Sequence, residues 1–183
     1  MKRFRGVPYL LAMGLITAAC ESAPAAPAVA DANSDQVTLG MRLKITEAGR
    51  LKADLTSDTA TTRQGQSTTY LQKVHLVMYE PGRQPSDLVS KAGEYDQEAG
   101  MMTARGNVVL VTQGDKGKRT ITTQELRWDQ RGDRVWSTVS TTIVEAGQTM
   151  ISDGFTSNSA FTNVQGKNAV VRGVKVGEGG FRF

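Results

Sequence analysis

The two side chains most often used for nucleophilic or metal chemistry occur once each in this sequence. His75 is the sole histidine and Cys20 the sole cysteine of the 183 residues. A zinc site, a Ser-His-Asp triad or a Cys-His pair needs several such groups to converge on one point. His75 lies in the alternating stretch VHLVMY, beside Val74 and Leu76, so we expect an exposed or partly paired histidine on a β-strand.

The acidic residues predict turns rather than a reaction centre. They lie in polar stretches between apolar ones, where Asp side chains bond to the nearby backbone, and comprise Asp96, Glu98, Asp115, Asp129 and Asp133. Two facing carboxylates would suit glycoside hydrolysis, which keeps an enzyme open as an alternative. The stretch GEGG at 177–180 opens no helix, so it is not a phosphate-binding loop. We predict a protein that is not an enzyme and has no cofactor or metal.

The basic residues have two interpretations, as contacts for lipid phosphates or as solvated strand faces and turn tips. The set comprises Arg105, Lys116, Lys118, Arg119, Arg127, Arg131 and Arg134. The chain has 22 basic and 18 acidic side chains, but three of the basic ones lie in the first five positions. The remaining 19 against 18 is close to neutral, which argues against a nucleic-acid partner.

Residues 1–19 have the layout of a lipoprotein signal peptide. A basic start precedes an apolar run and the sequence Thr17-Ala18-Ala19-Cys20, which departs from a usual lipobox by a threonine in place of leucine. We predict that Cys20 is lipidated and anchors the protein to a membrane. The alternative is an uncleaved anchor, although the apolar run is shorter than the ~20 residues that span a bilayer.

Composition divides the rest of the chain into three parts. Residues 20–36 are rich in Ala and Pro and predict a flexible tether that follows the lipidated cysteine. Residues 37–176 form the predicted folded domain, and residues 177–183 a Gly-rich tail. No second cysteine is present to form a disulfide, so the domain must be held by burial and strand pairing.

Short alternating stretches predict an all-β domain with antiparallel hairpins. The stretch YLQKVHLVMY places Val74, Leu76 and Met78 on one face, with Leu71 on the other. Turns are expected at 114–117 and at 146–148, each between two runs of strand-forming residues. Strands at this spacing predict a meander.

The hairpins repeat along the sequence. Tyr95-Asp96 aligns with Trp128-Asp129, and Leu88-Val89-Ser90 with Ile121-Thr122-Thr123, both at an offset of 33 residues. A third copy follows at an offset near 29, and a weaker fourth begins at Leu55-Thr56-Ser57-Asp58. Because one hairpin cannot bury its apolar face alone, stacked hairpins must share a continuous apolar surface.

This stacking predicts an elongated, open β-jelly roll, or V-shaped trough, with a lipid-binding inner wall. The predicted lining comprises Val74, Leu76, Met78, Val108, Leu110, Leu126, Trp128, Val139, Ile143, Phe155 and Val171. A closed, packed core is the alternative explanation of the same residues. An elongated trough also leaves strand edges open at both ends, and such edges need a partner.

The order and spacing of these elements resemble the LptC family, within the LptA/LptC/OstA group of β-jelly rolls. The resemblance covers residues 70–172 and rests on four elements: Ala-x-x-Tyr-Asp ending at Tyr95-Asp96, Gly106-Asn107-Val108, Thr122-Thr123-x-x-Leu126-x-Trp128-Asp129, and Gly154-Phe155. It departs from the family at the N-terminus, since many members keep an uncleaved helix. In addition, Glu21 follows the lipidated cysteine where aspartate would retain a lipoprotein in the inner membrane.

The resemblance implies a carrier of lipopolysaccharide in the periplasm. Such a protein accepts the lipid from LptF/LptG-like periplasmic domains of an ABC transporter in the inner membrane. It passes the lipid to an LptA-like bridge by edge-strand pairing. A lipid anchor would hold this chain at the inner membrane, with the outer membrane as an alternative.

Two further functions remain open from the residues alone. One is a structural or adhesive β-repeat lipoprotein with a packed core and no lipid cargo. The other is the enzyme with facing turn carboxylates.

Overall fold

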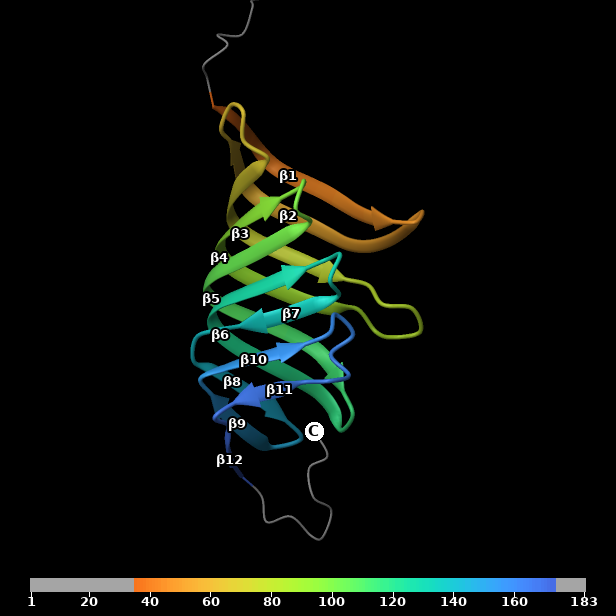
Figure 1. The fold of residues 1–183 in the computed structure, drawn as a ribbon, viewed down its shortest axis with the longest axis vertical. Helices are drawn as coiled ribbons and strands as arrows, with labels where there is room; N and C mark the ends of the chain where they lie inside the picture. The colour runs from red at the N-terminus through yellow and green to blue at the C-terminus, as the bar shows by residue number, and fades with distance from the viewer. Residues whose placement is uncertain (1–34, 174–183) are drawn as a thin grey trace, which may run out of the picture. The chain divides into compact units, whose positions relative to one another are not determined.

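A computed structural model of the protein describes residues 35–173, which form twelve β-strands. The strands are β1 (Gln36–Glu47), β2 (Arg50–Thr62), β3 (Thr68–Met78), β4 (Ser86–Asp96), β5 (Met101–Gly114), β6 (Gly117–Asp129), β7 (Arg134–Ser137), β8 (Thr141–Glu145), β9 (Gln148–Ser152), β10 (Gly154–Ser157), β11 (Gln165–Lys167) and β12 (Val170–Arg172). Every pairing between them is antiparallel, which confirms the predicted all-β fold. Figure 1 shows the strands stacked one below another, with β1 at the top and β12 at the bottom.

The sheet is a meander that divides at β6. Strands β1 to β7 pair in sequence order, and that path continues through β10 to β11. The first half of β6, Arg119–Thr123, pairs instead with β8, which leads to β9 and β12. The second half, Arg127–Asp129, pairs with β7. The sheet does not close on itself, because β1 has β2 as its only partner among the described strands.

The long strands are interrupted near their middle. The interruption includes residues with positive φ: Lys73 in β3 at 52°, and Gly106 and Asn107 in β5 at 76° and 51°. The ladder shifts its register between β4 and β5 and between β5 and β6 at the same level. Such an irregularity resets the alternation of side chains between the two faces of a strand.

This reset keeps apolar side chains on the inner face along the whole strand. In β3, Leu71 is 2% exposed, and the buried series then resumes at Val74. Strict alternation predicted that Leu71 lies on the face opposite to Val74. This prediction is wrong, because the bend at Lys73 turns the Leu71 side chain inward. Buried residues from both sides of the bends belong to one core, so the two halves of the sheet face each other.

A buried hydroxyl marks the bend in three consecutive repeats. Ser57, Ser90 and Thr123 follow one another at intervals of 33 residues, and each donates its hydroxyl to the carbonyl two residues later, at 3.3, 2.8 and 3.3 Å. Two residues before each hydroxyl stands a fully buried aliphatic side chain: Leu55, Leu88 or Ile121. The 33-residue repeat, including its weaker N-terminal copy, is therefore a structural unit.

The polar turns also repeat. Asp96 accepts a hydrogen bond from the N–H of Ala99, and Asp129 accepts from the N–H groups of Arg131 and Gly132, at 2.9 to 3.0 Å. Asn158, the equivalent residue of the third copy, accepts from Thr162 N–H at 3.0 Å. These bonds confirm that the acidic side chains of these repeats serve the turns. The expected turns at 114–117 and 146–148 are also present.

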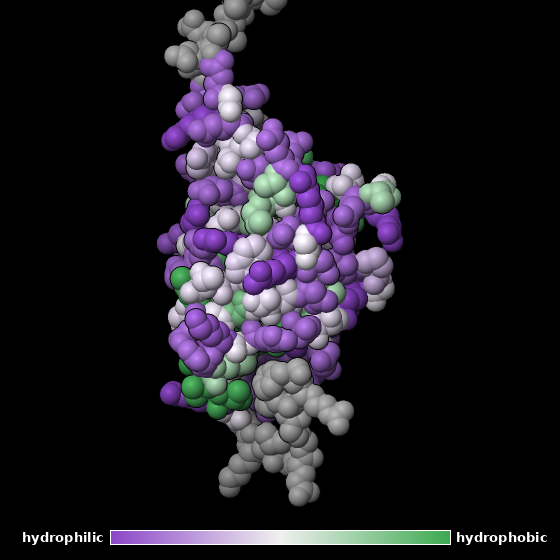
Figure 2. Space-filling model, in the orientation of Figure 1, coloured by the Kyte–Doolittle hydropathy of each residue, from purple (hydrophilic) through white to green (hydrophobic). Residues whose placement is uncertain are grey.

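Most of the visible outer surface is hydrophilic (Figure 2), in agreement with a buried apolar interior. Apolar side chains are exposed at both ends of the stack, with Val37 and Leu39 on β1 and Val170 and Val171 on β12. The two ends of the sheet are therefore edge strands with exposed apolar side chains.

The hydroxyl at the bend can be tested by Ser90→Ala. Its loss leaves the Ala92 carbonyl without this bond, so we expect the free energy of unfolding in urea to fall by about 1–2 kcal/mol. Ser152 is the matched control, because it is the equivalent residue of the third copy and its buried hydroxyl has no hydrogen-bond partner among the described residues. Ser152→Ala should cause no loss, and equal losses at the two positions would contradict the assigned role.

Acid should weaken the turn between β4 and β5 through Asp96. The N–H of Ala99 is the main cause that holds the pKa of Asp96 below 3.8. Because the folded state favours the charged carboxylate, its contribution is present above pH 3.8 and is lost as the pH falls through the lower folded pKa. A ¹³C titration, assigned with Asp96→Asn, should give a midpoint below 3.8, and a higher midpoint would refute this interpretation.

Candidate functional site: the apolar interior

The interior between the two halves of the sheet contains nine of the eleven predicted lining residues. They are buried to 5% exposure or less and comprise Val74, Leu76, Met78, Val108, Leu110, Leu126, Trp128, Ile143 and Phe155. These side chains come from β3, β5, β6, β8 and β10, so each strand pair contributes to one continuous apolar surface.

Two predicted lining residues lie elsewhere. Val139 is 38% exposed because residues 138–140 leave the ladder in a bend between β7 and β8. Val171 is 41% exposed because it lies on β12, an edge strand with no described strand beyond it. Val139 was therefore wrongly placed in the lining, because strand alternation does not extend through this bend.

The sequence-based lining omitted several buried side chains. They comprise Leu55, Leu71, Leu88, Tyr95, Met102, Ile121 and Phe161, among others. The repeat alignment pairs Leu88 with Ile121 and Tyr95 with Trp128, and this pairing is the signal that could have identified three of them. Phe161 follows a turn outside any strand, where alternation gives no information.

The lining side chains fill the interior by contacting one another. Leu76, Leu88 and Leu110 are 0% exposed. Residues 35–173 contain no cysteine that could join the halves by a disulfide. Hydroxyls line the bend itself, where Thr123 Oγ1 lies 3.1 Å from Ser137 Oγ and accepts from Thr141 at 3.3 Å.

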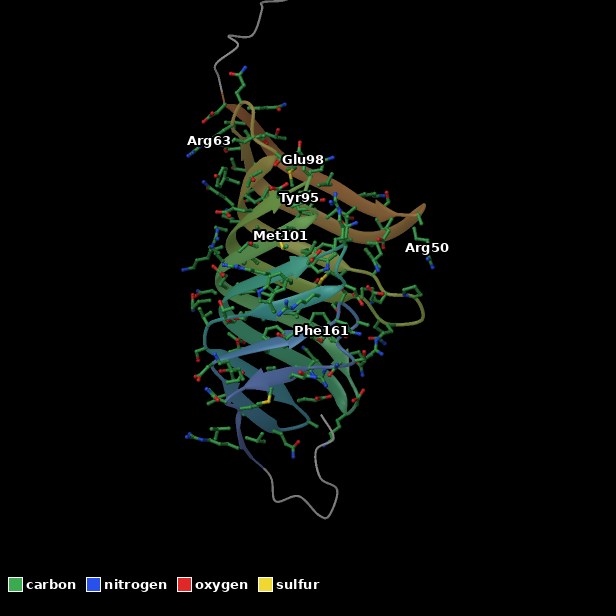
Figure 3. All side chains as sticks on the ribbon, in the orientation of Figure 1. Arg50, Arg63, Tyr95, Glu98, Met101 and Phe161 are labelled. Carbon is green, nitrogen blue, oxygen red and sulfur yellow. The ribbon has the colours of Figure 1, made fainter. Side chains whose placement is uncertain are left out.

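The closing segment, residues 158–164, lies between β10 and β11 and packs against the interior. Phe161, labelled in Figure 3, is 1% exposed and has a positive φ of 53°. The guanidinium of Arg119 donates to the Phe161 carbonyl at 2.8 Å and to Glu145 Oε2 at 2.8 and 3.1 Å. This buried arginine therefore joins β6 and β8 to the closing segment.

Two further bonds fix the same segment. Trp128 Nε1 donates to Ser159 Oγ at 3.1 Å, and the N–H of Ser159 donates to Asp133 Oδ1 at 3.0 Å. Asp133 therefore has a structural role in this end of the fold.

Several titratable side chains of the outer face lie against a partner of opposite type. His75 Nε2 lies 2.8 Å from Asp87 Oδ2, and both side chains are about half exposed, which confirms the expected partly paired histidine. Burial opposes the charge of Glu125, but Arg105 and Arg127 bind it and hold its pKa below 4.5.

No cluster of His, Cys, Asp and Glu within residues 35–173 has the arrangement of a metal site. The same residues include no apolar helix long enough to cross a bilayer.

The folded antiparallel sheet and its apolar interior define an all-β protein of the jelly-roll type. A family model described as "Lipopolysaccharide-assembly, LptC-related" matches residues 10–174. Because this match covers most of the chain, the protein belongs to the LptC family, which confirms the resemblance found in the sequence. Family membership gives it a role in lipopolysaccharide transport.

The chain is also similar to a solved structure. It is the crystal structure of LptH from Pseudomonas aeruginosa, the LptA homologous periplasmic component of the lipopolysaccharide transport device. The identity is 13%, the match covers 62% of this chain and 80% of that chain, and the TM-score is 0.49. No curated protein matches the sequence.

The ion pair at the closing segment predicts a large loss of stability for Arg119→Ala. The side chains of Arg119 and Glu145 are only 10% and 15% exposed, so removal of the cation leaves an uncompensated carboxylate. We expect the free energy of unfolding to fall by about 3 kcal/mol. Arg105→Ala, at a side chain that is 42% exposed, should cost less than about 1 kcal/mol. Similar losses for the two variants in urea unfolding would contradict the assignment.

Proposed function

We propose that the protein is the LptC-type lipid carrier of lipopolysaccharide export. It accepts lipopolysaccharide from an inner-membrane ABC transporter and passes it to an LptA-like periplasmic bridge. The observation that carries this proposal is the apolar interior, which continues from Leu55 on β2 to Phe155 on β10. The mechanism is non-covalent: acyl chains lie between the halves of the sheet, and the sugars and phosphates remain in water.

Entry of an acyl chain requires the two halves to separate, and the interactions in the interior permit this. The lining side chains make hydrocarbon contacts with one another, and lipid tails offer contacts of the same kind. When an acyl chain enters, the lining side chains replace contacts with one another by contacts with the lipid. Their apolar surface therefore stays buried. Each buried apolar Å² contributes about 25 cal/mol, so partial burial of several acyl chains is ample for capture.

The ends of the sheet are suited to pairing with other proteins of the relay. β1 has one unpaired edge along its length, with Val37 at 59% and Leu39 at 78% exposure. At the other end, β12 exposes Val170 at 53%. Added strands at these edges would continue the sheet into LptF/LptG-like domains on one side and an LptA-like protein on the other.

The membrane anchor is a separate part of the proposal. Cys20, the signal peptide 1–19 and the tail 177–183 lie outside the described residues. We propose that Cys20 carries the acyl chains that hold the protein at the periplasmic face of the inner membrane. The preceding apolar run and the small residues 18 and 19 support this assignment.

A structural β-repeat lipoprotein is the second candidate. The near-complete burial of the lining residues favours it, because a permanently packed interior would have the same exposures. The two candidates differ in whether a lipid reaches the interior in cells.

Photo-crosslinking distinguishes them. A photoreactive residue at Leu76, Leu126 or Ile143 should form adducts with lipopolysaccharide, because these positions line the interior. The same residue at Val89 or Val144, which are 43% and 40% exposed, is the control and should form none. If the folded protein forms no adduct at any of the three interior positions, the carrier function is rejected in favour of the structural one.

A further inference from the structure

The outer faces of the two halves of the sheet differ, although β5 and β6 run through both halves. On the half that contains β7, these strands present Arg105 and Arg127, which pair with Glu125. On the half that contains β8, the same strands present Val109 and Thr122, which are cross-strand neighbours. Strand propensity favours β-branched residues in both halves, so it does not explain this difference. We name the two surfaces the β7 face and the β8 face.

The β8 face is a continuous array of uncharged, β-branched side chains across six strands. One row of cross-strand neighbours comprises Val89, Val109, Thr122, Thr142, Ile151 and Val170, and the row beside it comprises Val111, Thr120, Val144 and Thr149. Val89, Val144, Ile151 and Val170 are exposed to solvent. Because β-branched side chains have few rotamers, they lose little entropy when another surface covers them. The array is therefore suited to packing against a second sheet.

The β8 face is not the surface that Figure 2 displays. Figure 1 shows β7, β10 and β11 in front of β8 and β9, so the hydrophilic surface in Figure 2 includes the β7 face.

Opposite charges lie at the two ends of the β8 face. Asp87, the cross-strand neighbour of Val111, lies at the β4 end and contacts His75 Nε2 at 2.8 Å. Arg172, the neighbour of Thr149, lies at the β12 end. A second copy that is turned end for end about an axis parallel to the strands brings each arginine opposite the partner's Asp87. The β8 face is therefore complementary to itself in charge as well as in shape.

We propose that the β8 face is a self-association surface, on which a second copy of this chain packs sheet on sheet. The two-fold axis is parallel to β6 and β8 and passes between them, so Thr142 and Val144 lie beside it. The uncharged rows of the two copies face each other, and Arg172 lies opposite the partner's Asp87 at both ends. This surface is separate from the interior and from the edge strands, so the assignment does not depend on lipid carriage.

The size of the surface sets the strength of the association. Six strands about 4.8 Å apart, each with two outward residues about 7 Å apart, cover roughly 400 Å² on each copy. A stable interface of standard size buries about 800 Å² on each partner. The dimer is therefore weak and dependent on concentration, and anchoring of both copies in one membrane would raise their effective concentration.

Sedimentation equilibrium of the purified protein, extended to millimolar concentration, tests this assignment. Val144→Lys should raise the dissociation constant of the dimer at least about tenfold, because the two-fold axis brings the two added charges together. Thr142→Lys, on the same strand, should have the same effect. Thr156→Lys is the matched control, because it adds the same charge beside Trp136 on the β7 face, and it should change nothing. Urea unfolding of each variant verifies that it folds.

A charge exchange tests the two-fold arrangement. Asp87→Arg and Arg172→Asp should each weaken the dimer, and the double variant should restore it, because each new arginine then faces a new aspartate of the partner. A wild-type protein that stays monomeric, an equal loss in Thr156→Lys, or a double variant without recovery overturns the proposal.

Co-sedimentation with vesicles of phosphatidylethanolamine and phosphatidylglycerol examines the other occupant of an uncharged face. If the protein binds these vesicles and Val144→Lys abolishes that binding while self-association is unchanged, the β8 face meets a lipid surface and the second copy is rejected. Unchanged vesicle binding in Val144→Lys, together with loss of the dimer, supports the proposal.

Discussion

The fold depends on the buried hydroxyls that three of its repeats place at the bend of a strand. A strand that bends out of its ladder leaves a carbonyl without its regular partner, and a buried carbonyl without a hydrogen bond is costly. Ser57, Ser90 and Thr123 supply that bond locally, two residues before the carbonyl they satisfy. The strand can therefore reset its alternation and present apolar side chains to the same interior from both of its halves.

This arrangement explains why the protein has one long interior rather than two separate sheet faces. Residues such as Leu88 and Tyr95 belong to the same strand, lie on opposite sides of its bend, and are both buried in the core. Each added hairpin lengthens the interior, and the sheet remains open at β1. The sheet ends at β1 with an unpaired edge, while farther along the chain Phe161 is held against β6 by the bond from Arg119 to its carbonyl.

The sequence predicted the β-class, the hairpins, several turns and most of the apolar lining, because these features depend on local alternation and on turn-forming residues. The repeat at 33 residues also identified Ser90 and Thr123 as equivalent, although their role required coordinates. Alternation failed where the backbone departs from it, at Leu71 beyond the bend in β3 and at Val139 between two strands. Phe161 could not be predicted, because its burial depends on Arg119, 42 residues earlier in the chain.

The order of the strands also bears on how the protein acquires its structure. From β1 to β7 each strand pairs with the next one in the chain, so most of the ladder forms by closing short loops. The entropy of closing such a loop is smaller than for strands that are distant in sequence. The bond between Arg119 and Phe161 bridges 42 residues, and we expect it to form late. The apolar interior would then assemble hairpin by hairpin, and Phe161 would dock on it only after β6 is in place.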